Sequence, residues 1–222
     1  MTRRGRRLAE RHGAALAHQF DDPEQQLEAS TLGMWAFLAT EILFFGGLFV
    51  AYIVYRLSYP QAFAAASHHL DIVLGTVNTG VLIGSSLTMV LAVYSAQLGR
   101  RRGQIVFLTT TLLLGLIFLG IKGLEYQHKF HEHLVPGAGF RFDEADPRHA
   151  AIFFSLYFAM TGMHAFHMVI GAGLLVWMAL RAWRREFSAA YYTPVEMVGL
   201  YWHFVDVVWI FLFPLLYLIG RH

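Results

Sequence analysis

The chain alternates between long apolar runs and short polar segments. Five of the runs are long enough to cross a bilayer as a helix, since about 20 apolar residues span the hydrocarbon core. They lie at about residues 30–56, 72–97, 105–126, 151–179 and 195–219. The connecting segments, including one with Pro60, are read as loops, and they leave no sizeable water-soluble domain. The pattern predicts an all-α protein, a polytopic membrane helix bundle with five transmembrane helices.

The composition agrees with a membrane protein and excludes several kinds of chemistry. Of the 222 residues, 56% are hydrophobic and 14% are charged, whereas soluble domains carry roughly 25% charged residues. The chain has no cysteine, which excludes disulfides, thiolate nucleophiles, iron–sulfur clusters and cysteine-ligated zinc. There is also no nucleotide-binding glycine loop and no hydrolase triad pattern. We expect no nucleic-acid partner.

The distribution of Lys and Arg predicts how the helices are oriented. Residues 1–29 form a polar, basic N-terminal tail, and the transmembrane domain follows at 30–222. The tail is not a signal peptide, because no short apolar region follows its arginines. Eleven Lys and Arg residues fall on the side of this tail and five on the opposite side. Because cytoplasmic segments carry the excess of positive charge, we expect the N-terminus inside and the C-terminus outside.

Polar side chains interrupt the apolar runs at two depths. With a rise of 1.5 Å per residue, one level lies within about 6 Å of the membrane midplane and the other roughly 9–14 Å toward the outside. The first level holds Glu41, His164, His167, His203 and Asp206. The second level holds Asn78, Lys122 and Glu125. Because such groups are costly at membrane depth, we expect them to meet one another or a partner inside a compact bundle.

Small residues indicate where helices approach one another. Gly46 and Gly47 in the first span permit close approach of a neighbouring helix. In the second span, Asn78–Thr79 and Gly84–Ser86 are small and polar groups that suit a helix–helix interface. These positions predict close helix contacts.

The histidines in the spans have two interpretations. His164 and His167 lie three residues apart on one helix face, and His203 lies in the last span. Two histidines on facing helices can ligate haem, with His203 as a third candidate ligand. Alternatively, all three form hydrogen bonds with carboxylates or backbone groups that hold the bundle together. The residue types alone favour the second interpretation.

Other patterns typical of metal sites are weak. Glu125 and His128 form a single Glu-x-x-His pattern, whereas a di-iron bundle needs two such patterns and two further carboxylates. A loop cluster can bind adventitious metal, although loop histidines are more often simply solvated. This cluster consists of His128, His131, Glu132, His133 and His149.

The carboxylates in the spans also leave alternatives open. Glu41 is either a proton-relay or lipid-contacting group, or a neutral acid hydrogen-bonded to a neighbouring helix. His203 and Asp206 share one helix face and form either part of a proton path or a structural pair, the second being favoured. Lys122 and Glu125 are three residues apart and are expected to satisfy each other.

Several motifs, taken in order, resemble subunit III of the haem–copper terminal oxidases. They stand at Trp35–Phe45, Asn78–Thr79, Gly120–Tyr126, Thr161–Gly171, and Glu196 followed by Tyr201–Trp209. The similarity covers about residues 30–222, and its last two motifs are the strongest. Longer members of that family have seven helices. This chain lacks the first two and resembles the five-helix bacterial form, in which an extension of subunit I can replace them.

The resemblance implies a non-redox subunit of a cytochrome c oxidase in the bacterial cytoplasmic membrane. Haem and copper would lie in the partner subunit I, with further copper in subunit II. This chain would carry no catalytic, cofactor-binding or metal-ligating residue. It would pack on subunit I and bind phospholipid, and it would support proton uptake and stability while oxygen is reduced to water.

The resemblance also suggests roles for individual residues. Glu41 would lie near a lipid cleft that faces subunit I, and it joins His203 and Asp206 as a lipid-binding or proton-related candidate. The remaining polar residues would be buried and structural. These are Asn78, Lys122, Glu125, His164, His167 and Glu196.

Three alternatives to a cytochrome c oxidase subunit remain. The chain is similar to subunit III of quinol oxidases, which share the five-helix form. A homologue associated with nitric oxide reduction and an independent membrane haem protein are the other two. The approach from Glu196 to Tyr201-Trp-His203 favours the cytochrome c branch.

Overall fold

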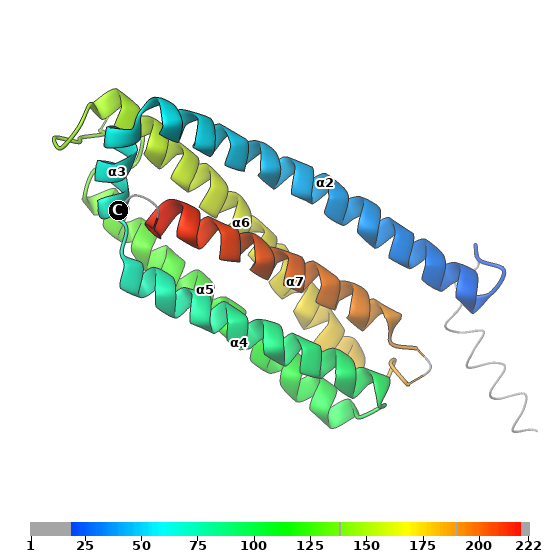
Figure 1. The fold of residues 1–222 in the computed structure, drawn as a ribbon. Coiled ribbons are helices and arrows are strands. Elements are labelled where there is room, and N and C mark those ends of the chain that lie inside the picture. The colour runs from blue at the N-terminus through cyan, green and yellow to red at the C-terminus, as the bar shows by residue number, and fades with distance from the viewer. Residues whose placement is uncertain (1–18, 138, 190, 219–222) are drawn as a thin grey trace, which may run out of the picture.

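The computed structural model describes residues 19–137, 139–189 and 191–218 (Figure 1). Within these residues, five helices are long and apolar enough to cross a membrane. They are α2 (Pro23–Ser58), α4 (Ile72–Gln97), α5 (Arg101–His131), α6 (Pro147–Trp183) and α7 (Thr193–Phe213), which continues as the π-helix η1 (Pro214–Leu218). The one β-contact among the described residues is an isolated bridge between Ser188 and Tyr191. The expected all-α bundle with five long apolar helices is confirmed.

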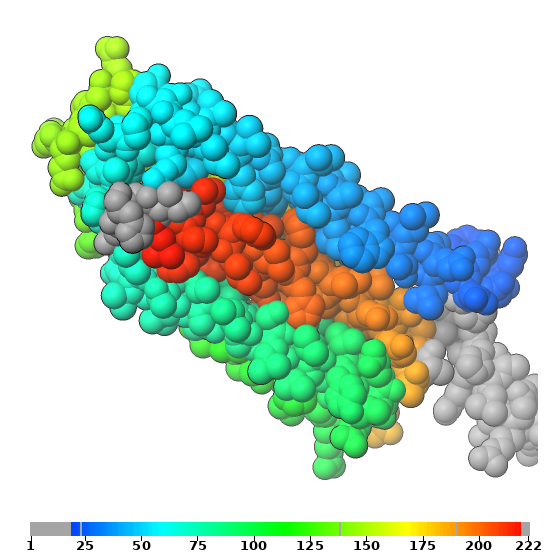
Figure 2. Space-filling model, viewed as in Figure 1, coloured from blue at the N-terminus to red at the C-terminus, as the bar shows by residue number. Residues whose placement is uncertain are grey.

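The helix α7 lies at the centre of the packing. It contacts α2, α4 and α6, while α5 packs against α4 and α6. On the face shown in Figure 2, α7 is flanked by α2 and α4. Large apolar side chains cover the outside of the bundle, for example Leu43 and Leu57 of α2, which are 77% and 76% exposed. An apolar exterior of this kind suits contact with lipid rather than water.

Three aspartates begin the helices α2, α4 and α6. Asp22 Oδ1 accepts a hydrogen bond of 2.8 Å from the backbone N–H of Gln25. Asp71 Oδ1 accepts from two N–H groups of the first turn of α4, at 2.8 and 3.0 Å. Asp146 Oδ1 accepts from the N–H of Arg148 at 2.8 Å, and this bond holds the pKa of Asp146 below its ordinary value. Each cap satisfies N–H groups that a helix start leaves unpaired.

Two helix boundaries differ from the sequence-based prediction. The helix α2 begins at Pro23 rather than near residue 30, so it includes the end of the segment expected as a polar tail. Residues 1–18 of that tail lie outside the described residues, as does residue 219 at the end of the last expected span. The segment around Pro60, expected as a loop, is the helix α3 (Pro60–His68). Proline is favoured at the first position of a helix, and the alanines that follow favour helix formation.

The close helix contacts lie at other glycines than Gly46 and Gly47. Both of these have open space where a Cβ would stand, so the prediction of close approach there was wrong. The polar positions of α4 are confirmed as an interface, since Ser85 Oγ accepts from Trp202 Nε1 at 3.1 Å and Thr79 Oγ1 accepts from Trp209 Nε1 at 3.1 Å.

Candidate functional site

The first polar cluster is a carboxyl–imidazole pair that joins α2 to α6. Glu41 Oε2 lies 3.1 Å from His167 Nε2. The other ring nitrogen, His167 Nδ1, lies 2.8 Å from the backbone oxygen of Met163. A carbonyl oxygen only accepts, so Nδ1 carries a proton and donates it. The Glu41–His167 bond then holds a further proton, which belongs either to a neutral Glu41 or to a charged His167.

This pair carries no net charge in either form. A neutral acid beside a neutral imidazole and a carboxylate beside an imidazolium both sum to zero, so the proton can change sides without placing a net charge in the membrane. The pair lies just below the surface, with the side chains of His167 and Glu41 9% and 19% exposed. Phe45 packs on the His167 ring and Tyr201 Oη donates to the His167 backbone oxygen at 3.0 Å. The arrangement can hold or pass one proton close to the outside of α2.

The second cluster surrounds the buried ammonium group of Lys122. Lys122 Nζ donates to Glu125 Oε2 at 3.0 Å, to Tyr157 Oη at 3.1 Å and to Tyr217 Oη at 2.9 Å. Tyr157 Oη in turn donates to Glu125 Oε1 at 2.7 Å, and Tyr217 Oη donates to the same oxygen. An ammonium group has three hydrogens to donate, and all three have acceptors here. We call these four residues the lysine cluster, which ties α5 to α6 and η1.

The lysine cluster contains two residues that sequence reasoning missed. Lys122 and Glu125 form the expected pair, but Tyr157 and Tyr217 complete it. A buried lysine needs three acceptors, and one carboxylate at i+3 does not supply them all. The lack of two further acceptors for Lys122 in its own helix was a feature of the sequence that could have been used. It indicates that side chains of other spans at similar depth, such as tyrosines, complete the site. With every donor satisfied by the chain itself, the cluster is suited to holding helices together.

The third cluster lies between α4 and α7. His203 Nδ1 is 2.8 Å from Ser86 Oγ of α4. Asp206 is 3% exposed, its carboxyl group interacts with the Ser86 hydroxyl of α4, and no hydrogen bond joins it to His203. His203 and Asp206 therefore do not bond each other, and the favoured structural pair was wrong. The His203 ring bonds across to α4 instead of back along its own helix.

The remaining buried candidates have partial hydrogen bonding. His164 Nε2 lies 3.1 Å from the Val205 backbone oxygen, and its ring contacts Phe118 and Trp209. Asn78 Nδ2 donates to the Phe118 backbone oxygen at 3.3 Å. Both residues connect the helices, as a structural role requires.

Glu196 is half-buried, so the expectation of a buried residue was wrong for it. It stands in the first turn of α7, where a negative charge is stabilised by the positive end of the helix dipole and where water is near.

The loop histidines stand apart from one another. His128 Nε2 lies 3.1 Å from Glu132 Oε1, and the His149 ring stacks on Tyr59 at a centroid distance of 3.7 Å. In the part of the chain that the structure describes, no three His, Asp or Glu side chains gather as a group that could hold a metal ion.

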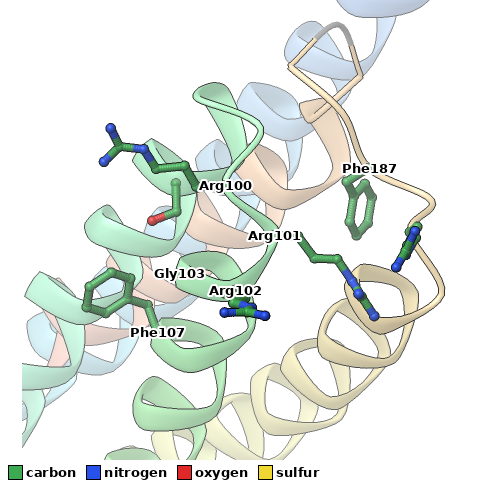
Figure 3. A pocket seen from close by; sticks show the side chains of 8 residues that line it. Arg100, Arg101, Arg102, Gly103, Phe107 and Phe187 are labelled. Atoms are coloured by element: carbon green, nitrogen blue, oxygen red, sulfur yellow. The ribbon is translucent and has the colours of Figure 1, made fainter.

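One end of the bundle carries a pocket rich in arginine (Figure 3). Its volume is about 800 Å³, and its lining includes Arg100, Arg101, Arg102, Arg185 and Phe187. Arg101 Nε donates to the Ala182 backbone oxygen at 3.1 Å, and its guanidinium also reaches the Trp183 backbone oxygen. The turn between α4 and α5 is thereby tied to the end of α6. The pocket brings arginines from the α4–α5 turn and the α6–α7 loop together at this end of the bundle.

Five apolar helices with paired polar groups inside define a polytopic membrane helix bundle. Comparison with protein families identifies the family of this bundle, because residues 24–221 match the model described as "Cytochrome c oxidase subunit III". The chain belongs to this family, the subunits III of haem–copper respiratory oxidases. It is therefore a subunit of a multi-subunit respiratory oxidase complex.

Similar proteins carry two kinds of name. "Cytochrome c oxidase subunit 3" of Thermostichus vulcanus is 33% identical over 213 residues, covering 96% of this chain and 97% of that protein. The protein of the same name from Corynebacterium diphtheriae is 34% identical, covering 85% and 87%. "Cytochrome bo(3) ubiquinol oxidase subunit 3" of Pseudomonas aeruginosa is 30% identical, covering 96% and 95%. The similarity thus extends to oxidases named for either electron donor.

Proposed function

We propose that this chain is the non-redox subunit III of a cytochrome c oxidase in the bacterial cytoplasmic membrane. It packs on subunit I, beside subunit II, and binds phospholipid along its apolar exterior. Haem and copper belong to those partner subunits, and this chain supplies scaffold and proton-related groups. The observation that carries the proposal is the match of residues 24–221 to the subunit III family. The engagement of His164 and His167 with backbone oxygens supports a structural rather than a ligand role for them.

A quinol oxidase subunit III is the second candidate, favoured by the similarity to the Pseudomonas aeruginosa protein. The experiment purifies the complex through a tag on this chain in mild detergent. We expect a haem-containing large subunit to co-purify, and we expect the complex to oxidise reduced cytochrome c but not ubiquinol. Oxidation of ubiquinol alone would replace the first candidate with the second. A chain that purifies alone with its own haem absorption would overturn both.

We propose further that the N-terminus faces the cytoplasm and that the arginine pocket lies on that side. The absence of native cysteine makes single-cysteine labelling possible. Asp143 and Ser188 are both exposed and lie in the α5–α6 and α6–α7 loops, at opposite ends of the bundle. In intact cells stripped of their outer layers, a membrane-impermeant maleimide should label Asp143→Cys and leave Ser188→Cys unlabelled. The reverse labelling would invert the topology.

We assign the Glu41–His167 pair a proton-holding role in the assembled oxidase. In Glu41→Gln the amide can donate to His167 Nε2, so the contact between α2 and α6 survives while the exchangeable proton is lost. We expect normal assembly, with slower proton uptake and a turnover lifetime shortened several-fold. The measurements are single-turnover proton uptake and activity over successive turnovers. Glu28→Gln, an exposed carboxyl change on the same helix, is the control, and equal behaviour of the two variants would remove Glu41 from this role.

A further inference from the structure

The arginine pocket, which lies between the α4–α5 turn and the α6–α7 loop (Figure 3), holds positive charge that the chain does not balance. Of the eight described residues that line it, four are arginines and none is acidic. Arg101 is bonded to the end of α6, and the neighbouring carboxylate of Glu186 is bonded to Arg181 at 2.6 Å. The other three guanidinium groups have no ion pair or hydrogen bond among the described residues, and they belong to Arg100, Arg102 and Arg185. Like charges gathered in a cavity favour the binding of an anion.

The helix α5 begins in this pocket, and its first turn adds to the positive charge. A helix N-terminus carries unpaired N–H groups and a partial positive charge. The helices α2, α4 and α6 each place an aspartate there, whereas α5 has Arg100, whose side chain makes no capping bond, and no acidic residue in its first turn. The N–H groups of Arg102 and Gly103 have no acceptor among the described residues. A helix start of this kind is suited to binding a phosphate group.

A buried hydroxyl in the wall of the pocket is an independent indication of a ligand. Ser95 is 5% exposed and lines the pocket. Its hydroxyl forms no hydrogen bond with any described residue. A Cβ on Gly103 would stand 2.9 Å from Ser95 Oγ, so the missing side chain at Gly103 leaves this hydroxyl room beside the start of α5. Buried polar groups nearly always have a partner, and the pocket is where the hydroxyl of Ser95 can meet one.

Arg185 occupies a backbone position that favours glycine. Its φ is 62°, in the left-handed region that a residue with a side chain adopts only at a cost. The helix α4 ends with Gly99 in the same conformation, at φ 66°. Glycine at position 185 would form the same helix end with less strain. Strained residues of this kind cluster at functional sites, and the Arg185 guanidinium lines the pocket.

We propose that the arginine pocket binds a phosphate group. Arg102 and Arg185 pair with its oxygens, the Ser95 hydroxyl donates to it, and the N-terminus of α5 faces it. Arginine pairs with phosphate through two parallel hydrogen bonds, which fixes the anion more firmly than a single charge does. The inference is independent of the electron donor and of the partner subunits, because this chain alone carries the site.

The shape of the pocket indicates that the phosphate belongs to a larger molecule. A volume of about 800 Å³ leaves room beyond one phosphate group, and Phe107 and Phe187 supply apolar wall. The pocket lies where α4 ends at Gln97 and α5 begins at Arg101, which is the level of a membrane–water interface. Two sources of the same chemistry reach this level. They are an anionic phospholipid headgroup, since basic pockets between membrane helices bind such headgroups, and a water-soluble phosphate compound.

The first experiment measures binding to the full-length chain purified in mild detergent. The probes are phosphatidylglycerol, followed by native mass spectrometry, and inorganic pyrophosphate, followed by equilibrium dialysis. We expect saturable binding of at least one probe. Binding of phosphatidylglycerol alone assigns the site to a lipid headgroup, and binding of pyrophosphate alone assigns it to a soluble compound. Competition between the two for one site assigns it to the phosphate group that they share. If neither probe binds saturably, the proposal is wrong.

The central variant is Arg185→Gly, which removes the guanidinium and relieves the backbone at once. We expect affinity for the bound probe to fall about ten-fold or more, because a charge-assisted pair is lost. The thermal unfolding midpoint should stay the same or rise, so a loss of binding is not a loss of folding. His133→Gly is the backbone control, since His133 has φ 57° at the far end of α5, and its affinity should not change.

Arg184→Gln controls for charge, because Arg184 is exposed and adjacent but does not line the pocket. We expect its affinity to stay within about two-fold of the unchanged chain, since surface charges are largely screened by salt. Equal losses in Arg184→Gln and Arg185→Gly would show diffuse attraction to a basic surface and would overturn the proposal.

Ser95→Ala tests the buried hydroxyl without changing any charge. We expect affinity to fall about five-fold, the effect of one hydrogen bond, and the unfolding midpoint to stay unchanged because the hydroxyl has no partner in the chain. Ser155→Ala on α6 is the control, since Ser155 is exposed and bonded within its own helix, and it should bind as the unchanged chain does. Full affinity in both Ser95→Ala and Arg185→Gly would contradict a phosphate site in this pocket.

Discussion

Lys122→Met is expected to destabilise the chain by about 3–5 kcal/mol, because it removes one partner of a buried ion pair. Glu125 is 3% exposed, so its carboxylate has no access to water once the ammonium is gone. The hydroxyls of Tyr157 and Tyr217 still donate to Glu125, but they bring no positive charge. The measurement is the thermal unfolding midpoint of the detergent-solubilised chain.

Lys129→Met is the matched control on the same helix. Lys129 is also 3% exposed, and its Nζ lies 2.6 Å from Glu132 Oε2. The side chain of Glu132 is 35% exposed, however, so water can solvate this carboxylate after the lysine is removed. We expect a clearly smaller loss of stability, and equal losses in the two variants would contradict the argument.

The double variant Lys122→Met/Glu125→Leu separates the loss of attraction from the cost of an unpaired charge. Replacing both members of a buried ion pair with apolar residues is often close to neutral. We expect the double variant to recover much of the stability that Lys122→Met loses. Recovery remains incomplete because the hydroxyls of Tyr157 and Tyr217 then lose their charged partners.

The lysine cluster also explains how the chain ends its last membrane helix. Pro214 lacks an N–H and cannot continue the hydrogen bonding of α7, and η1 begins at this residue. Tyr217 of η1 is fixed by Lys122 and Glu125. Tyr52 Oη of α2 donates to the Leu215 backbone oxygen at 2.8 Å. We infer that these bonds from α2 and α5 hold η1 against the bundle.

The five membrane helices could be predicted from the sequence because the thickness of a bilayer fixes the length of an apolar run. The depth of each polar residue in the membrane was predictable for the same reason. The predicted depths placed Glu41 at the level of His167 and Lys122 at the level of Glu125, and the structure brings both pairs together. What depth does not determine is the rotation of each helix about its axis.

The rotation of the helices decides which side chains bond. His203 and Asp206 share a helix face and a depth, yet both face Ser86 of α4 and no hydrogen bond joins them to each other. That result depends on how α4 packs on α7, which neither spacing nor hydropathy specifies. The helix α3 was missed for a different reason. A proline opens it, and proline in a sequence reads first as an interruption.

Packing around Trp202 is the second feature with a large expected effect. The Trp202 indole of α7 lies between two glycines, Gly115 of α5 and Gly171 of α6. A Cβ at Gly115 would stand 2.7 Å from Trp202 Cη2, and one at Gly171 would stand 2.9 Å from Cε3 and Cζ3. The indole has little freedom to move aside, because its Nε1 is hydrogen-bonded to Ser85. Gly171→Val is therefore expected to cost about 1–3 kcal/mol or more through overpacking.

Gly173→Val provides the control for this substitution, because it makes the same chemical change on the same helix. No heavy atom lies within 4 Å of a Cβ built at Gly173, so valine meets open space there, and its helix propensity exceeds that of glycine. Thermal unfolding should show a lower midpoint for Gly171→Val and an unchanged or slightly higher one for Gly173→Val. If both variants unfold at the same temperature, the indole does not constrain the α5–α6–α7 packing as its contacts indicate. If Gly171→Val alone is unstable, adding Trp202→Phe should recover part of the loss, because the smaller ring leaves room for the valine.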